Sequence, residues 1–273
     1  MRILITGGSG FIGKHLTLSL LKENHDVYVI DKVSTNLLPP NKQKTIDIID
    51  VNESDSFFSG FDICIHLAAL VSVEKSINDP ITSFGDNTFC TVKMLEICKI
   101  HNIKKIIFSS SAAVYGNKEG AVSETDETNP ITPYGLDKLV SEKYIKMHGE
   151  LWNIDYLILR LFNVFGNGQN PEYAGVITAF NIAKQKNEPL VIYGDGEQTR
   201  DFIKVEDVCT HILNLINKNI KNEIFNIGTG NGVSINEVAK HFNSHIVYKE
   251  ARKEIKHSRA NIEKLNLINA SIK

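Results

Sequence analysis

The stretch Thr6-Gly7-Gly8-Ser9-Gly10-Phe11-Ile12-Gly13 decides the fold of this chain. It follows the apolar segment Arg2–Thr6, which predicts a buried strand, and it opens a segment with apolar residues at helical spacing. A glycine-rich turn between a strand and a helix is typical of dinucleotide binding, because backbone amides and the helix N-terminus attract a pyrophosphate. The residues of this turn that we predict to bind the cofactor are Gly7, Gly10, Phe11, Ile12 and Gly13.

An acidic residue follows the second predicted strand, roughly 20 residues after the turn. In dinucleotide-binding sites the residue that binds the ribose hydroxyls lies at this position. The Asp31 carboxylate can accept hydrogen bonds from ribose hydroxyls and would repel a 2′-phosphate, which favours NAD over NADP. The neighbouring Lys32 weakens that preference. The alternative of a glycine turn without a ligand is disfavoured by position, spacing and acid together.

Strand-like and helix-like segments alternate in the first half of the chain, which predicts an α/β fold with a doubly wound parallel sheet of the Rossmann type. Strands are expected at Arg2–Thr6, Asp26–Ile30, Lys44–Ile48, Ile63–Leu67, Lys105–Ser109 and Tyr156–Arg160, with helices at Gly13–Glu23, Phe84–His101 and Pro133–Leu151. The second half is less regular: Asn163–Tyr173 is expected to be a loop, followed by a helix at Val176–Lys186, a strand at Leu190–Tyr193 and strand–helix pairs near 202–216 and 224–242. We therefore expect a Rossmann domain over 1–165, with 202–227 packing back onto it, and a small substrate-binding lobe from 166–201 and 228–273.

The composition is that of an ordinary globular protein. Of the 273 residues 42% are hydrophobic and 23% charged, and the formal net charge of −2 argues against nucleic acid as the main partner. Neither a signal peptide nor the ~20 apolar residues of a membrane span are found, and we expect a cytoplasmic protein. The four cysteines are far apart and predict buried thiols rather than a metal site: Cys64, Cys90, Cys98 and Cys209.

A tyrosine and a lysine are placed for acid–base chemistry. Tyr134 and Lys138 are four positions apart and share a face of the predicted helix, where the lysine charge would favour the phenolate and lower the pKa of the tyrosine. A serine run, Ser109–Ser111, ends the fifth strand, at the sheet edge where ligands bind. Each pattern alone is also common on ordinary helices and turns.

Together the motifs resemble those of the extended short-chain dehydrogenases/reductases, in particular the NAD-dependent nucleotide-sugar epimerases and dehydratases. The resemblance covers nearly the whole chain. It rests on TGGSGFIG at 6–13, HLAA at 66–69, FSSSAAVYG at 108–116, PYGLDK at 133–138, LRLFNVFG at 159–166 and YGDGEQTRDF at 193–202.

The resemblance implies roles for the matching positions. Tyr134 would be the catalytic base, Lys138 would hold the nicotinamide ribose, and Ser111 would bind the reacting sugar oxygen. Further cofactor-binding positions would be Asp31, Lys32, Asp47, Ile48, Leu67, Ala68, Ala69, Asn87 and Ser109. Substrate-binding positions would be Val71, Ser111, Asn163, Val176, Tyr193, Arg200 and Arg252.

The resemblance also narrows the reaction. Dehydratases of this family carry an Asp–Glu pair directly after the motif serine, whereas this chain has Ala112 and Ala113. A 4-epimerase of UDP-glucose and UDP-galactose, passing through a 4-keto sugar, is therefore favoured, and a small residue at the position of Ser258 would admit N-acetylated sugars. Alternatives are a 4-reductase or 4,6-dehydratase on a GDP- or dTDP-sugar, and a non-catalytic NAD-binding relative. The resemblance further implies a homodimer through Phe84–His101 and Pro133–Leu151, and a substrate lobe shortened at its C-terminus.

Overall fold

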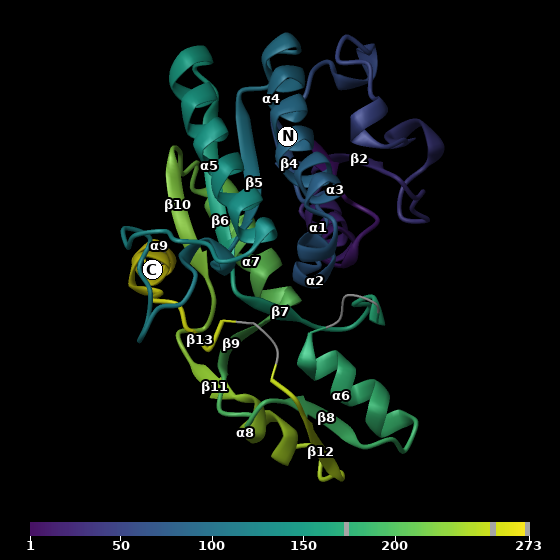
Figure 1. Ribbon diagram of the computed structural model, residues 1–273. Helices are drawn as coiled ribbons and strands as arrows, with labels where there is room; N and C mark the ends of the chain where they lie inside the picture. Colours follow the sequence, from purple (N-terminus) through teal and green to yellow (C-terminus); the bar gives the residue numbers. More distant parts are fainter. Residues whose placement is uncertain (172–174, 252–254, 271–273) are drawn as a thin grey trace.

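Seven parallel strands form the central sheet of the computed structural model, which describes residues 1–171, 175–251 and 255–270 (Figure 1). Their order is β10-β6-β5-β4-β1-β2-β3. The strands are β1 (Arg2–Thr6), β2 (Asp26–Asp31), β3 (Gln43–Thr45), β4 (Ile63–His66), β5 (Lys105–Ser111), β6 (Asp155–Leu161) and β10 (Glu223–Ile227). The strand order reverses between β1 and β4, so their carboxyl ends border a crevice of the kind that binds ligands in such sheets. The predicted doubly wound α/β fold is confirmed.

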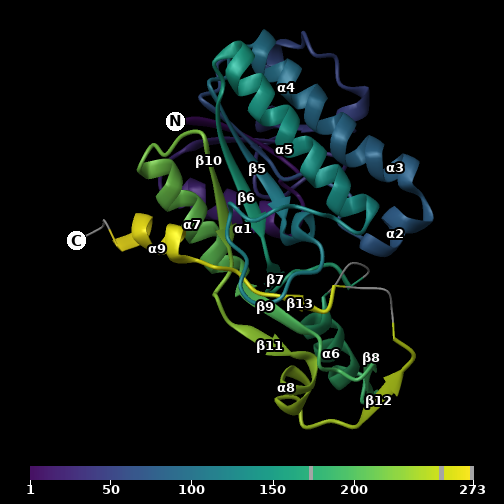
Figure 2. The same ribbon diagram turned by 60° about the vertical axis from the view of Figure 1, so that its left-hand side comes forward.

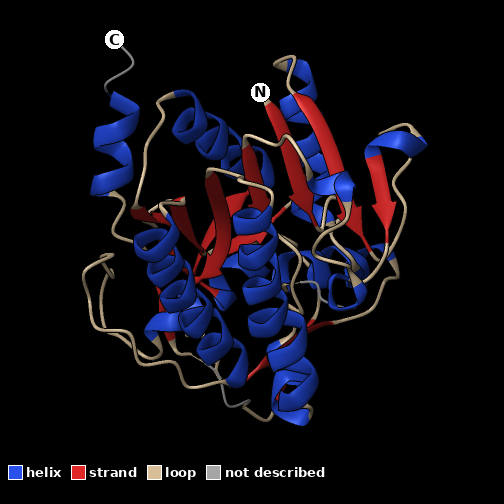
Figure 3. Cartoon of the chain, turned by 90° about the horizontal axis from the view of Figure 1, so that it is seen from above, coloured by secondary structure: helices blue, strands red, loops and turns tan. Residues whose placement is uncertain are grey.

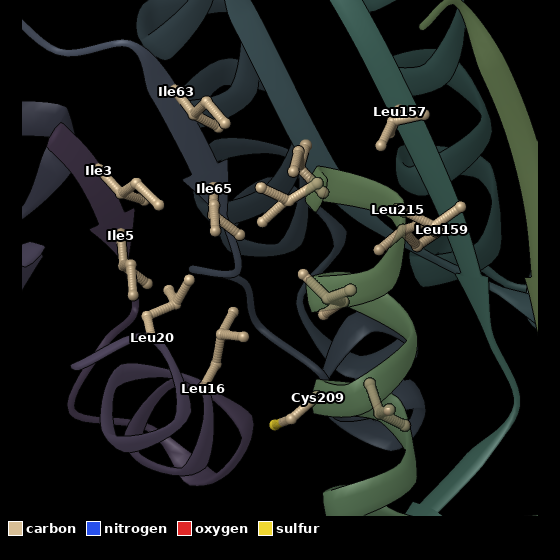
Figure 4. Packing of buried hydrophobic residues seen from close by; sticks show 14 of the residues in the cluster. Ile3, Ile5, Leu16, Leu20, Ile63, Ile65, Leu157, Leu159, Cys209 and Leu215 are labelled. Carbon is tan, nitrogen blue, oxygen red and sulfur yellow. The ribbon is translucent and has the colours of Figure 1, made fainter. Parts of the chain in front are cut away.

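Helices cover both faces of this sheet (Figure 3). One face carries α1 (Phe11–Lys22) and α7 (Val205–Asn217), and the other carries α4 (Cys90–Ile100) and α5 (Pro133–Trp152). Alternate residues of β1 serve the two faces: Ile3 and Ile5 pack against the side of α1 and α7 (Figure 4), while Leu4 lies in the opposite core.

A helix is present where one was predicted near Phe84–His101, but it begins earlier, at Pro80. The helix α3 (Pro80–Phe84) leads through a π-helical turn, Gly85–Phe89, into α4, and a separate short helix, α2 (Val73–Asn78), precedes α3. Pro80 cannot continue α2, and the Asp79 side chain caps α3 by accepting a hydrogen bond from the Thr82 amide. The helices α2 and α3 are therefore separate, with the break at Asp79.

The predicted strand at Lys44–Ile48 is also too long. It ends at Thr45, because the Asp47 side chain accepts a hydrogen bond from the Ile49 amide and starts a 3₁₀ turn over Ile48–Asp50. The other predicted strands of the large sheet agree with the structure to within a residue or two at their ends.

A second, smaller unit lies below the carboxyl ends of the large sheet (Figure 2). Its four-stranded sheet has the order β11-β9-β13, with β7 beside β9, and a two-stranded sheet pairs β12 with β8. The elements are β7 (Asn163–Phe165), α6 (Val176–Gln185), β8 (Leu190–Tyr193), β9 (Thr199–Lys204), β11 (Gly232–Ser234), α8 (Ile235–Lys240), β12 (Ile246–Lys249) and β13 (His257–Ser258).

The predicted loop at Asn163–Tyr173 is wrong at its start, because β7 pairs with β9 through Asn163 and Phe202. A strand of three residues is too short to show an alternation of apolar and polar side chains, and its partner β9 is distant in the sequence. The last helix, α9 (Glu263–Ala270), was not predicted, and its Leu265 joins the core beneath the large sheet. Within the described ranges no helix combines the length and apolarity needed to cross a bilayer.

Candidate active site

The glycine turn lies against the end of β4 in the crevice. Gly7 has φ +71°, and a Cβ there would come within 2.7 Å of the Ala68 amide nitrogen. A Cβ on Gly13 would lie 2.2 Å from the Gly7 carbonyl oxygen. The sequence therefore places glycine where the turn, the helix and the neighbouring strand end are in backbone contact.

The N-terminus of α1 faces this turn with its amides available. Gly10 is the N-cap residue and supplies no side-chain cap, so the first amides of α1 lack the usual side-chain acceptor and suit an anion. Asp31 accepts hydrogen bonds from the Ser9 amide (2.9 Å) and the Val33 amide (3.1 Å), which ties the turn to the end of β2. A close-approach glycine turn, an open helix N-terminus and an adjacent carboxylate fit a dinucleotide.

Other predicted cofactor residues border the same crevice. Lys32 forms ion pairs with Asp47 (2.8 Å) and Asp86 (3.2 Å). These two carboxylates balance the positive charge of Lys32, which had weakened the preference for NAD over NADP. Asn87 is buried and is hydrogen-bonded to both backbone groups of Leu70. Ile48 is buried in the core beside β2, and Leu67, Ala68 and Ala69 directly follow β4.

The structure brings Ser111, Tyr134 and Lys138 together. Ser111 ends β5, and its Oγ accepts a hydrogen bond from the Ala113 amide at 3.1 Å, so the Ser111 hydroxyl hydrogen can still be donated to another acceptor. The Lys138 ammonium donates to the Ser109 carbonyl oxygen at 2.8 Å. The start of α5 and the end of β5 thus form one polar group at the sheet edge.

Burial governs the proton affinities of this group. It raises the pKa of Tyr134, and the Ser111 side chain only partly offsets the rise. Burial also lowers the pKa of Lys138 to about 7, against the opposing effect of the Asp137 and Glu142 carboxylates. The prediction that Lys138 lowers the pKa of Tyr134 is wrong for this arrangement: Nζ lies 5.9 Å from the ring centroid, and desolvation dominates.

Several polar residues that hold α5 in place were not predicted. Ser76 on α2 accepts a hydrogen bond from the Tyr134 amide (3.2 Å), and Ser83 on α3 donates to Asp137 (2.6 Å). Single serines in amphipathic segments give no sequence signal for these contacts.

Further along α5, Glu142 and Arg160 form a buried two-pronged ion pair, with Nε–Oε1 at 3.0 Å and Nη2–Oε2 at 2.8 Å. Ser110 and Tyr115 complete this network by hydrogen bonds to the carboxylate and the guanidinium, respectively. Arginine is scarce in this sequence, where it occurs at Arg2, Arg160, Arg200, Arg252 and Arg259. This scarcity is the one sequence signal that points to a specific role of Arg160.

The predicted substrate residues come mostly from the smaller unit. Tyr193 ends β8, Val176 begins α6, Asn163 begins β7, and Val71 is exposed in the segment before α2. Arg200 lies on β9 opposite Ser258 of β13, and its guanidinium donates to the Thr199 carbonyl at 2.9 Å. Arg252 lies outside the described residues.

Beside Arg200, the fully buried Asp201 holds the smaller unit together. Its carboxylate accepts hydrogen bonds from the Thr229 amide and hydroxyl, both at 2.7 Å, and from the amides of Gly230 (2.9 Å) and Ala260 (3.1 Å). It thereby joins β9 to the loop after β10 and to the segment after β13. Asp201 lies within the motif at 193–202, but no role was predicted for its carboxylate.

We expect Gly13→Ala to weaken NAD binding at least tenfold, because the added Cβ would displace the Gly7 carbonyl and with it the phosphate turn. Titration calorimetry or cofactor fluorescence measures the affinity. Gly85→Ala is the matched control, since its Cβ would meet nothing closer than 3.9 Å. Equal NAD affinities for the two variants would contradict the assignment of the turn.

Comparison with known proteins agrees with this geometry. The model of the NAD-dependent epimerase/dehydratase family matches residues 3–228. A Methanocaldococcus jannaschii protein, named provisionally as a UDP-glucose 4-epimerase, is 40% identical over 264 residues, with 92% of this chain and 86% of that protein covered.

Two solved structures share the whole architecture. The UDP-N-acetylglucosamine 4-epimerase of Methanobrevibacter ruminantium M1, in complex with UDP-N-acetylmuramic acid, has a TM-score of 0.89 at 35% identity, covering 98% of this chain and 91% of that one. The UDP-glucose 4-epimerase of Thermotoga maritima, solved with UDP-glucose, has a TM-score of 0.90 at 33% identity, covering 98% and 92%. With a glycine turn, a Ser–Tyr–Lys group and this likeness over nearly its full length, the chain belongs to the NAD-dependent epimerase/dehydratase family.

Proposed function

We propose that this protein is an NAD-dependent UDP-sugar 4-epimerase that interconverts UDP-glucose and UDP-galactose and also accepts the corresponding N-acetylated pair. The observation that carries the proposal is the Ser111–Tyr134–Lys138 group at the end of β5, followed by a 3₁₀ turn that begins with Ala112 and Ala113. Alanine cannot transfer the additional proton that elimination of a C6 oxygen requires.

NAD, when bound, supplies the acceptor and donor of hydride at C4 of the sugar. The residues of this chain handle the proton: Tyr134 takes it from the 4-hydroxyl and returns it after the keto sugar has turned over. The Ser111 side chain lowers the pKa of the phenol, and its single hydroxyl hydrogen would be donated to the reacting sugar oxygen. Lys138, held by the Ser109 carbonyl, would bind the nicotinamide ribose. Because burial raises the pKa of Tyr134, its base form depends on positive charge brought near it.

The smaller unit supplies groups for the UDP moiety. Arg200 is a planar cation suited to two phosphate oxygens, and the buried Asp201 next to it fixes the strand that carries it. Ser258 pairs with Arg200 in the parallel register of β13 and β9, so its small side chain lies on the same side of the sheet. This placement supports space for an acetamido group near the sugar.

Arg200→Lys is expected to raise the KM for the UDP-sugar roughly tenfold or more with a smaller change in kcat, because one point charge replaces a two-pronged donor. Steady-state kinetics at saturating NAD measures both constants. Arg259→Lys, in the same unit, is the matched control. An unchanged KM in Arg200→Lys would exclude the arginine from the diphosphate site.

The assay that tests the function offers UDP-galactose and UDP-N-acetylgalactosamine separately, with NAD, and follows the products by chromatography. We expect both sugars to reach a mixture of 4-epimers without net formation of NADH. Consumption of reduced cofactor, or release of a dehydrated keto sugar, would instead indicate a 4-reductase or a dehydratase. Retention of NAD without turnover of either sugar would indicate a binding protein.

An apolar face of α3, the π turn and α5 supports a homodimer. On α5, Leu136, Met147 and Leu151 recur at helical spacing and are 42–62% exposed. On the neighbouring segment, Ile81 and Phe84 are 85% and 52% exposed, and α3, α4 and α5 lie side by side in the structure (Figure 2). Two such faces related by a twofold axis would bury each other in a four-helix bundle.

Phe84→Glu is expected to convert a dimer to a monomer, because it places a charge in the buried centre of the proposed interface. Light scattering coupled to gel filtration gives the mass. Leu18→Glu changes an exposed apolar residue, 44% exposed against 52% for Phe84, on the opposite side of the sheet and should leave the mass unchanged. A monomeric wild-type protein at micromolar concentration would contradict the proposal.

For the location of the protein we propose the cytoplasm, which the four buried free thiols support.

A further inference from the structure

A buried histidine joins the strand ends that border the cofactor crevice. His66 is the last residue of β4 and is fully buried. Its Nδ1 lies 2.6 Å from the hydroxyl of Thr6, the last residue of β1, and its Nε2 lies 3.2 Å from the hydroxyl of Thr91 on α4. Both threonines are buried as well. One imidazole thus bridges the two strands of the crevice and the helix behind them.

The partners of the threonines fix which ring nitrogen carries the proton. The Thr6 hydroxyl oxygen accepts a hydrogen bond from the Ala68 amide (3.2 Å), so its own hydrogen is available for His66. The Thr91 hydroxyl donates to the Asn87 carbonyl (2.7 Å), so it can only accept from His66. Nδ1 is therefore an acceptor and Nε2 a donor. The hydrogen bonds run in one direction from the Ala68 amide to the Asn87 carbonyl, and every donor and acceptor in this series has a partner.

A second proton on the ring would break this chain. It would place a donor against the Thr6 hydroxyl, whose hydrogen would then lack its acceptor. It would also add a charge near Lys138: the His66 ring stacks on Phe108 with centroids 5.8 Å apart, and the Lys138 ammonium lies 4.7 Å from the Phe108 ring centroid. Burial and the Lys138 charge together lower the pKa of His66 to about 3.

Both ends of the hydrogen-bonded chain are cofactor positions. Ala68 touches the glycine turn, since its amide nitrogen is the atom that a Cβ on Gly7 would meet. Asn87 holds the backbone of Leu70. Ser109, whose carbonyl accepts the hydrogen bond from Lys138, also donates its hydroxyl to the His66 carbonyl at 3.2 Å.

We infer that His66 is a positioning residue for the cofactor site: as a neutral imidazole protonated at Nε2, it fixes the ends of β1 and β4 against α4 so that the glycine turn and the Ala68 backbone keep their spacing. Any effect of His66 on the turnover of a UDP-sugar rests on the proposed epimerase function. The protonation state of His66 and its effect on NAD binding do not depend on that function.

The tautomer is tested directly on the full-length protein labelled with ¹⁵N-histidine. Long-range ¹⁵N–¹H spectra distinguish a protonated from an unprotonated ring nitrogen, and the signal missing in His66→Asn identifies His66 among the 9 histidines. We expect an unprotonated Nδ1 and a protonated Nε2, and we expect this protonation state to stay the same from pH 8 to pH 5. Protonation at Nδ1, or titration within this range, would overturn the inference.

The positioning role is tested by affinity. His66→Leu removes both hydrogen bonds and should weaken NAD binding roughly tenfold or more, whereas His66→Gln can still donate to Thr91 and should recover part of the loss. Leu215→Ala, a buried change in α7 away from the crevice, serves as a control of comparable loss in melting temperature. If His66→Leu and Leu215→Ala lose melting temperature alike and both keep wild-type NAD affinity, His66 has a structural role only. If His66→Leu binds NAD normally but turns over no UDP-sugar, the positioning inference also fails.

Discussion

Tyr134→Phe is expected to lower kcat for the conversion of UDP-galactose about 10³-fold, within the range that a general acid–base group contributes. The substitution removes the phenolic hydroxyl beside Ser111 and keeps the aromatic ring at the start of α5. Because the proposed role of that hydroxyl is to transfer the proton in the transition state, kcat and kcat/KM should fall by similar factors while KM changes little.

The control for this prediction is Tyr156→Phe, which removes a phenol at the opposite, amino-terminal end of the sheet. NAD affinity and melting temperature should match the wild type in both variants. If Tyr134→Phe kept more than a tenth of the wild-type kcat, another group would have to transfer the proton. A loss of NAD binding in Tyr134→Phe would instead place the defect in the cofactor site.

Arg160→Met is expected to destabilise the fold by about 3–5 kcal/mol, because it leaves the Glu142 carboxylate buried without its partner. Both side chains are 4% exposed or less, and the pair joins α5 to β6 next to the end of β5. The free energy of unfolding from denaturant titration measures the loss. As a control, Lys221→Met breaks an ion pair that is 49% exposed on the lysine side and should cost less than about 1 kcal/mol.

A double substitution separates the pair from its surroundings. Glu142→Gln combined with Arg160→Met leaves no buried charge at this position, so the double variant should be more stable than Arg160→Met alone. Additive losses in the two single variants would mean that the carboxylate and the guanidinium do not depend on each other. The Ser110 hydroxyl donates to the same carboxylate, so a shift of Glu142 should also be felt at the end of β5.

The sequence was most informative where the backbone itself restricts the residue. Gly7 and Gly13 occupy positions that no side chain fits, and therefore the turn, the strand before it and the helix after it could be predicted together. Tyr134, Lys138 and Ser111 could be brought to one place because a parallel sheet puts strand ends and helix starts at the same edge.

What could not be predicted depends on distant partners or on burial. The strands β7 and β13 are three and two residues long, and each is stabilised by β9 rather than by its own pattern. Asp201 and Ser76 act through backbone amides that only the tertiary structure brings to them. The pKa of Tyr134 was predicted in the wrong direction because helical spacing says nothing about desolvation.

The pairing of β10 with β6 has a consequence for how the chain folds during synthesis. Residues 1–161 supply six strands of the large sheet, but β6 stays an unpaired edge until Glu223–Ile227 has been made. Leu157 and Leu159 of β6 are completely buried in the core that includes α7, and they would meet solvent until α7 has been made as well. An apolar strand with free amides and carbonyls is a template for self-association. A nascent or truncated chain that stops before β10 should therefore aggregate, although it contains every residue of the Ser–Tyr–Lys group.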